Sequence, residues 1–122
     1  MHPSSFRFLR QLASHEPLVL RLRGGCMNPH LVEGAEVEVR RRRVYLPGDV
    51  VVFRTPAGDL AAHRLLGWRR RGFVTKGDGC VMHDGPVRRE SIVGAVMSPV
   101  PLRARVLALA AYARIIARRL LR

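Results

Sequence analysis

The chain has 122 residues, 48% of them hydrophobic and 25% charged, which excludes a disordered protein and suits one domain with its own core. Its two cysteines, Cys26 and Cys80, are too few for a disulfide framework, although a single bridge between them stays open. Lys76 is the only lysine, so arginine supplies almost all of the net charge of +13. Such a charge favours solubility, or attraction to an anionic membrane, a nucleic acid or an acidic peptide.

The N-terminal part predicts a helix, then a strand, then a glycine turn. Apolar residues recur at helical spacing in residues 1–15, which form a short helix or an extended lead that Ser4 or Ser5 caps. Residues 18–22 form a short strand, which ends before Gly24 and Gly25. We expect no secretory signal peptide and no transmembrane span, because no stretch reaches the ~20 apolar residues that cross a bilayer.

The middle of the chain predicts a mostly antiparallel β structure. The expected strands cover residues 36–40, 50–53, 60–68, 72–75 and 91–100, with turns at 47–49 and 55–59. Short strands separated by regular turns are typical of sandwiches and barrels. The expected fold class is therefore mainly β, an antiparallel barrel that is partly closed.

The C-terminal part predicts a basic amphipathic helix over residues 102–122, after a β domain formed by residues 1–101. One face of this helix is apolar, with Leu102, Val106, Leu109, Ala113, Ile116 and Leu120 at three- and four-residue steps. The helix either packs this face on the β domain or on a second copy, as a homodimer, or lies on an anionic membrane surface. We expect a location that is cytoplasmic or peripheral at the inner face of the membrane.

Cys26 is the first candidate for chemistry. It follows Gly24 and Gly25, which permit a tight turn, and precedes Met27 and Pro29, of which the proline fixes the exit of that turn. A side chain on such a turn, beside backbone N–H groups, suits a nucleophile with an oxyanion hole. The alternative is a small buried thiol with no reactivity.

His63 is the second candidate. It lies in an expected strand, with the small residues Ala61 and Ala62 before it. A neutral imidazole within hydrogen-bond reach of a thiol can take its proton and form a thiolate–imidazolium pair. The alternative is a half-buried strand histidine with a structural role.

Several segments resemble, in the same order, the conserved boxes of the signal peptidase I superfamily, which also contains self-cleaving SOS and phage repressors. The matching segments are Cys26-Met27-Asn28-Pro29, Gly48-Asp49-Val50-Val51-Val52-Phe53, His63-Arg64, Lys76-Gly77-Asp78, Asp84 and Ile92-Val93-Gly94-Ala95-Val96. The resemblance covers the chain from about Gly24 to Val100. It differs from the family pattern at Cys26, where the family has serine.

The resemblance implies an endopeptidase in which Cys26 is the nucleophile and His63 is the general base. His-Arg at this position is similar to the endoplasmic-reticulum and archaeal members, in which an aspartate orients the imidazole. Asp78 and Asp84 are the candidates for that aspartate, and either could instead be a turn residue.

Other residues have supporting roles by the same resemblance. Gly24, Gly25, Met27 and Pro29 would form the oxyanion and substrate-binding turn, and Arg64, Lys76 and Gly77 would support the site. We expect no cofactor and no metal, because the histidines lack zinc-ligand spacing.

The cysteine leaves three functions open. The chain is a Cys–His peptidase, a non-catalytic relative that binds a peptide or a membrane, or a serine peptidase whose nucleophile has been replaced. A weaker alternative is a nucleic-acid-binding protein, through the arginines at 40–43 and 69–71. These clusters lack interleaved aromatic residues in the sequence, so nucleic acid is not the expected partner.

Overall fold

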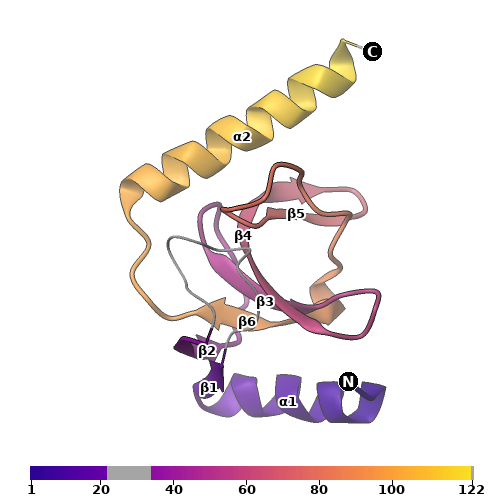
Figure 1. The fold of residues 1–122 in the computed structure, drawn as a ribbon, viewed down its shortest axis with the longest axis vertical. Coiled ribbons are helices and arrows are strands. Elements are labelled where there is room, and N and C mark those ends of the chain that lie inside the picture. The colour runs from indigo at the N-terminus through magenta and orange to yellow at the C-terminus, as the bar shows by residue number, and fades with distance from the viewer. Residues whose placement is uncertain (22–33, 122) are drawn as a thin grey trace.

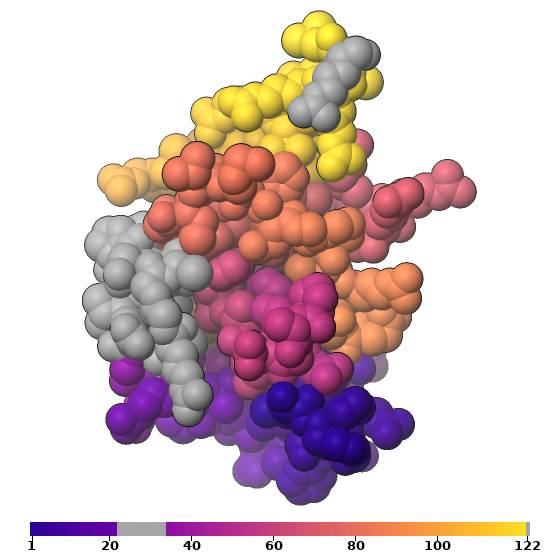
Figure 2. Space-filling view, turned by 45° about the vertical axis from the view of Figure 1, so that its right-hand side comes forward, coloured from indigo at the N-terminus to yellow at the C-terminus, as the bar shows by residue number. Residues whose placement is uncertain are grey.

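A computed structural model describes residues 1–21 and 34–121. Figure 1 shows a curved sheet between an N-terminal helix and a C-terminal helix, and Figure 2 shows the two helices at opposite ends of the molecule. The elements are α1 (Pro3–His15), β1 (Leu18–Arg21), β2 (Glu36–Arg40), β3 (Val50–Arg54), β4 (Leu60–Arg69), β5 (Gly72–Lys76), β6 (Ile92–Val96) and α2 (Leu102–Leu120), with a short 3₁₀ turn at Arg89–Ser91 before β6. The prediction of a mainly β fold with a C-terminal helix is confirmed.

The described strands form one antiparallel sheet in the order β1-β2-β6-β3-β4-β5. Register shifts after Val52 and after Leu65 bend it, as β-bulges do. Four strands nevertheless separate β1 from β5, and no pairing joins these two ends within the described residues. This sheet is therefore open, and the partial barrel closure expected from the sequence is not seen in it.

The central strand β3 is buried on both faces, which explains its continuous apolar sequence. Val50 and Val52 pack toward α1, where Phe6 is also buried, while Val51 and Phe53 pack into a second cluster on the opposite face. Each such side chain contributes roughly 1.5–3 kcal/mol when fully buried. Strand β6 is shorter than predicted, since the chain beyond Val96 runs into two prolines that cannot donate to a sheet ladder.

Helix α1 starts one residue before the serines that were expected to cap it. Pro3 is at its first position, where a missing N–H costs nothing. The His2 Nδ1 atom accepts a hydrogen bond from the Ser4 backbone N–H at 3.1 Å, so His2 is the N-cap. The prediction of a serine cap is therefore wrong, although the prediction of a helix is confirmed.

Helix α2 packs against β4 through a face that the apolar periodicity did not predict. The packed residues are Ala108, Ala111, Tyr112 and Ile115, against Leu66 and Val74. A methyl group on Gly67 would approach the Tyr112 ring to 2.6 Å, so the bare glycine lets this ring lie on the strand. Leu102 and Leu120, on the predicted apolar face, are 77% and 80% exposed. In the described part of the chain, no helix is both long and apolar enough to cross a membrane.

Candidate active site

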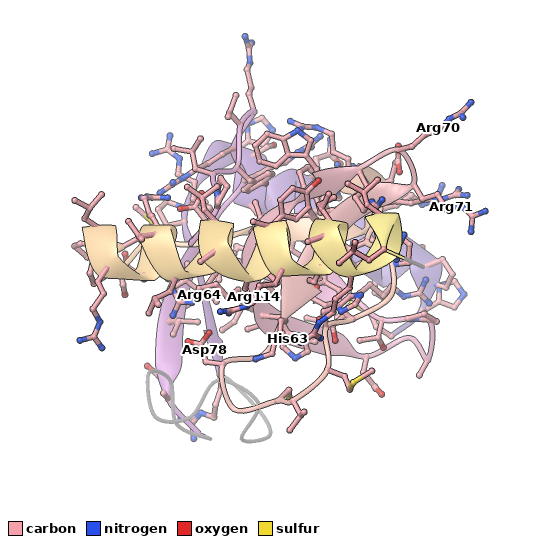
Figure 3. The ribbon with its side chains drawn as sticks, turned by 90° about the horizontal axis from the view of Figure 1, so that it is seen from above. His63, Arg64, Arg70, Arg71, Asp78 and Arg114 are labelled. Atoms are coloured by element: carbon pink, nitrogen blue, oxygen red, sulfur yellow. The ribbon has the colours of Figure 1, made fainter. Side chains whose placement is uncertain are left out.

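His63 lies near the middle of β4, opposite Val51 of β3. Only 9% of the residue is exposed, and its ring meets Phe53 edge to face with the ring centroids 5.5 Å apart. Strand β3 pairs with β4 at His63, and β5 pairs with β4 on the other side from the next residue, Arg64. Figure 3 shows His63 below α2, on the side of the molecule that also carries Asp78.

Asp84 is the carboxylate that contacts the imidazole. Its Oδ2 atom is 2.5 Å from His63 Nδ1 and accepts a second hydrogen bond from the Thr75 hydroxyl at 2.7 Å. The Asp84 backbone N–H also donates to the Thr75 carbonyl at 2.8 Å, which anchors the loop after β5 to that strand. An ionised Asp84 keeps the proton on Nδ1, so the Nε2 atom carries the lone pair that can accept a proton.

The environment of Asp84 lowers its pKa below the ordinary value of 3.8. Burial alone raises the pKa, but the hydrogen bonds from His63 and Thr75, together with the charges of His63 and His83, outweigh it. Asp84 is therefore a carboxylate at neutral pH, and it can stabilise a positive charge on the His63 ring.

Asp78, the other candidate carboxylate, is bound by Arg64. Arg64 Nε and Nη2 donate to Asp78 at 3.0 and 2.7 Å, and Nη1 donates to the Gly48 carbonyl at 2.7 Å. Because neighbouring side chains of a strand point to opposite faces, His63 and Arg64 each contact a different aspartate. The choice that the sequence left open is resolved in favour of Asp84 as the partner of the imidazole.

The segment Lys76–Asp78 forms the turn that carries Asp78 to Arg64. Lys76 pairs with Arg64 across the β4–β5 ladder, and its Nζ atom is 3.4 Å from the Gly77 carbonyl. Gly77 accepts a hydrogen bond from the Cys80 backbone N–H at 2.9 Å, which closes the turn. Lys76 and Gly77 thus lie in the turn that carries Asp78, and their supporting role stays a prediction.

A second turn, before β3, is fixed by Gly48 and Asp49. Gly48 has φ +100°, and a methyl group there would come within 2.8 Å of Arg105 Cγ. Asp49 is 2% exposed and accepts hydrogen bonds from the Leu46 N–H at 2.8 Å and Arg105 Nη1 at 3.2 Å. Arg105 thus ties α2 to the turn whose carbonyl holds Arg64.

The predicted nucleophile turn lies outside the described residues. This applies to Cys26 and to Gly24, Gly25, Met27 and Pro29. The structure accordingly describes His63 and Asp84, and Cys26 lies outside the residues that it describes.

Thr75 and Phe53 also contribute to the candidate site, and neither was predicted as part of it from the sequence. Thr75 is fully buried and holds Asp84, and Phe53 packs on the His63 ring. A hydroxyl in a buried strand needs a partner, so the position of Thr75 among the apolar residues of β5 was the available signal. Phe53 offered none, because it belongs equally well to the core.

No family model matches the chain, and no curated protein matches it either. The chemistry of the site therefore rests on its own geometry. In the described ranges, no group of three or more histidines, cysteines and acidic residues could hold a metal ion. What these ranges bring together is a buried imidazole, an ionised carboxylate on its Nδ1 and a hydroxyl that holds this carboxylate, an arrangement suited to proton transfer at Nε2.

Proposed function

We propose that the protein is a small endopeptidase similar to signal peptidases, with Cys26 as nucleophile, His63 as general base and Asp84 as the residue that orients the base. The observation that carries the proposal is the 2.5 Å contact between His63 Nδ1 and Asp84 Oδ2, on a strand held from both sides. The order of the sequence boxes supports the same assignment, and with it a fold of the signal-peptidase type. Thr75 and Phe53 add support, since they restrict the carboxylate and the ring.

The proposed reaction has two stages. Cys26 Sγ attacks the carbonyl carbon of the scissile peptide bond while His63 Nε2 takes the thiol proton. Backbone N–H groups of the glycine turn stabilise the oxyanion, and the imidazolium returns the proton to the leaving amine as the C–N bond breaks. The thioester that results is hydrolysed by water, which gives its proton to His63 and its oxygen to the acyl carbon. The new carboxyl product leaves and the thiol is restored.

The substrate in this proposal is an extended segment of a peptide or protein precursor. Such a segment would add to a sheet edge by β-augmentation, in which main-chain hydrogen bonds hold the chain and pockets select side chains.

The proposal is tested by the rate of Cys26 alkylation with iodoacetamide as a function of pH, with Cys80→Ser in every variant. A thiol paired with His63 should react quickly well below pH ~8.5, the reference pKa of a free thiol. His63→Ala should abolish this reactivity, whereas His83→Ala, in the neighbouring loop, should preserve it. An ordinary profile that ignores His63 contradicts the thiol-peptidase assignment, and turnover by Cys26→Ser would then indicate a serine enzyme with its nucleophile replaced.

A second candidate function is binding without turnover, with α2 on an anionic membrane surface. It is favoured by the exposure of Leu109 and Leu120 on a helix rich in arginine, since apolar side chains that no element covers suit the acyl boundary. Replacing both by glutamate should release the protein from phosphatidylserine vesicles in co-sedimentation. Glutamate at Val81 and Met82, which are also exposed, is the control that should leave binding unchanged. Equal loss in the two variants would contradict a role for α2.

A further inference from the structure

A large groove runs beside the hairpin formed by β4 and β5. It has a volume of about 1530 Å³ and is open to solvent. Its lining comes from residues 43–45, 68–74, 83–84, 86 and 88–90 and from Arg119 of α2. In Figure 2 the turn after β4 and the segment before β6 project from the same side of the molecule. The volume exceeds the ~300–1,000 Å³ that small-molecule sites usually have. A chain segment therefore fits the groove better than a small metabolite.

The described lining is strongly cationic, with seven arginines against two carboxylates. The arginines are Arg43, Arg69, Arg70, Arg71, Arg88, Arg89 and Arg119. Asp84 and Glu90 supply the carboxylates, and Asp84 is already bonded to His63 and Thr75. Arg70 and Arg71 extend away from the body of the molecule in Figure 3. Charges of one sign gathered in a groove attract a ligand of the opposite sign, so the ligand should be multiply anionic.

One guanidinium of the groove needs an acceptor. Arg69 Nη1 is buried and has no hydrogen-bond partner within the part of the chain that the structure describes. A buried donor without an acceptor destabilises the structure that contains it. Carboxylates match the planar fork of a guanidinium with two parallel hydrogen bonds. An incoming carboxylate would supply the acceptor that Arg69 lacks.

Aromatic side chains lie among these arginines. Tyr45 and Trp68 each meet Phe73 edge to face, with centroids 6.2 and 6.4 Å apart, and the Arg89 guanidinium lies 5.9 Å over the Tyr45 ring. Trp68 is 52% exposed. Tyr45 follows the arginines at 40–43, and Trp68 and Phe73 flank those at 69–71, so the rings and the arginines reach the groove together. Tyr45 is only 4% exposed, so Trp68 is the ring that offers most apolar contact beside the positive charge.

We propose that this groove binds an acidic segment of a polypeptide, with glutamate or aspartate on the arginines and apolar side chains on the aromatic rings. This inference rests on the proposed function: the acidic segment is the part of the substrate that places the scissile bond near His63. The groove reaches Asp84, which is bonded to His63, so a chain bound in it runs beside the acid–base pair.

The geometry favours a polypeptide over a single-stranded nucleic acid. Nucleic-acid channels present aromatic faces on which successive bases stack. Here the rings of Tyr45 and Trp68 are tilted by 87° and 67° against Phe73, so the cluster is no parallel series of platforms.

Trp68, the chain's single tryptophan, makes the proposal measurable because its emission reports what enters the groove. The full chain carrying Cys26→Ala, which prevents turnover, is titrated with a glutamate-rich peptide that lacks tryptophan. The same peptide with glutamine for glutamate, and an oligothymidylate of equal charge, are titrated in parallel. We expect the acidic peptide to bind at least tenfold more tightly than either of them.

Two double variants test whether binding depends on the groove or only on the overall positive charge of the protein. Arg70→Gln with Arg71→Gln should weaken binding of the acidic peptide about tenfold, whereas Arg7→Gln with Arg103→Gln, exposed arginines outside the groove, should change it less than twofold. Equal loss in the two pairs, equal binding of the glutamine peptide, or tighter binding of the oligothymidylate would overturn the proposal. Binding here is independent of Cys26, so groove binding with an unreactive thiol would refute only the proposed peptidase, and a reactive thiol without groove binding would refute only this inference.

Discussion

The two faces of β4 carry two acid–base pairs that differ in kind. On one face His63 meets Asp84, and on the other Arg64 meets Asp78. Arginine stays charged at any physiological pH, so the second pair is a permanent ion pair that also grips the Gly48 carbonyl. Histidine gains and loses a proton near neutrality, so the first pair can do chemistry. Adjacent residues of one strand thus hold a permanent ion pair and a pair that can exchange a proton.

We expect the largest effect for a substitution of Arg64, on the face of β4 that carries the permanent ion pair. Arg64→Met leaves Asp78 and the Gly48 carbonyl without their donor in a largely buried site, where the loss of one partner costs about 3–5 kcal/mol. Urea unfolding should show this loss. A change below about 1 kcal/mol, as surface pairs give, would mean that the pair contributes little to the fold.

On the face of β4 that carries His63 and Asp84, we expect substitutions to change the rate of Cys26 alkylation rather than the stability of the protein. Asp84→Asn would donate from its amide to Nδ1 and move the imidazole proton to Nε2, the tautomer that cannot accept the thiol proton. We expect Cys26 alkylation at pH 6.5 to slow by on the order of a hundredfold, in a Cys80→Ser background. Asp78→Asn is the matched control. If Asp78→Asn slows alkylation as much as Asp84→Asn does, Asp84 is not the aspartate that specifically supports the imidazole.

We expect a smaller effect at Thr75, which contacts Asp84 rather than His63. Thr75→Val keeps the shape of this fully buried residue but removes the hydroxyl that donates to Asp84. The free energy of unfolding should fall by about 1–2 kcal/mol, and alkylation should slow only a few-fold. An unchanged alkylation rate and stability together would show that Asp84 does not depend on this hydrogen bond.

The smallest effect is a pH dependence of stability. Because the folded pKa of Asp84 lies below 3.8, its contribution is fully present above pH 3.8 and is lost as the pH falls through the lower folded value. Unfolding by urea between pH 5 and pH 2 should therefore show a steeper loss in the parent than in Asp84→Asn. Parallel curves would contradict the lowered pKa.

The sequence predicted most elements because their patterns are local. Alternation in residues 36–40 and the apolar run at 50–53 identified β2 and β3, to within a residue for the latter. The packed face of α2 was not predictable, since it depends on the space above Gly67 and on the Arg105–Asp49 ion pair. Periodicity reports which residues are apolar but not which neighbour is available.

The candidate site was predictable as a set of residues but not as pairs. His63 and both aspartates were identified, yet the choice between Asp78 and Asp84 depends on the β4–β5 register and on the loop hydrogen-bonded to Thr75. The arginine groove was missed because its lining comes from four separate parts of the chain.

Because His63 and Arg64 point to opposite faces of β4, the candidate site forms only when β4 is in the observed register with its neighbours. A slip of β4 by one residue would turn each side chain to the opposite face and bring the guanidinium of Arg64 against Phe53. A misregistered chain would therefore lose the proposed general base and bury an uncompensated charge in the same event. The register that pairs Arg64 with Asp78 is thus also the one that places the imidazole of His63 beside Asp84.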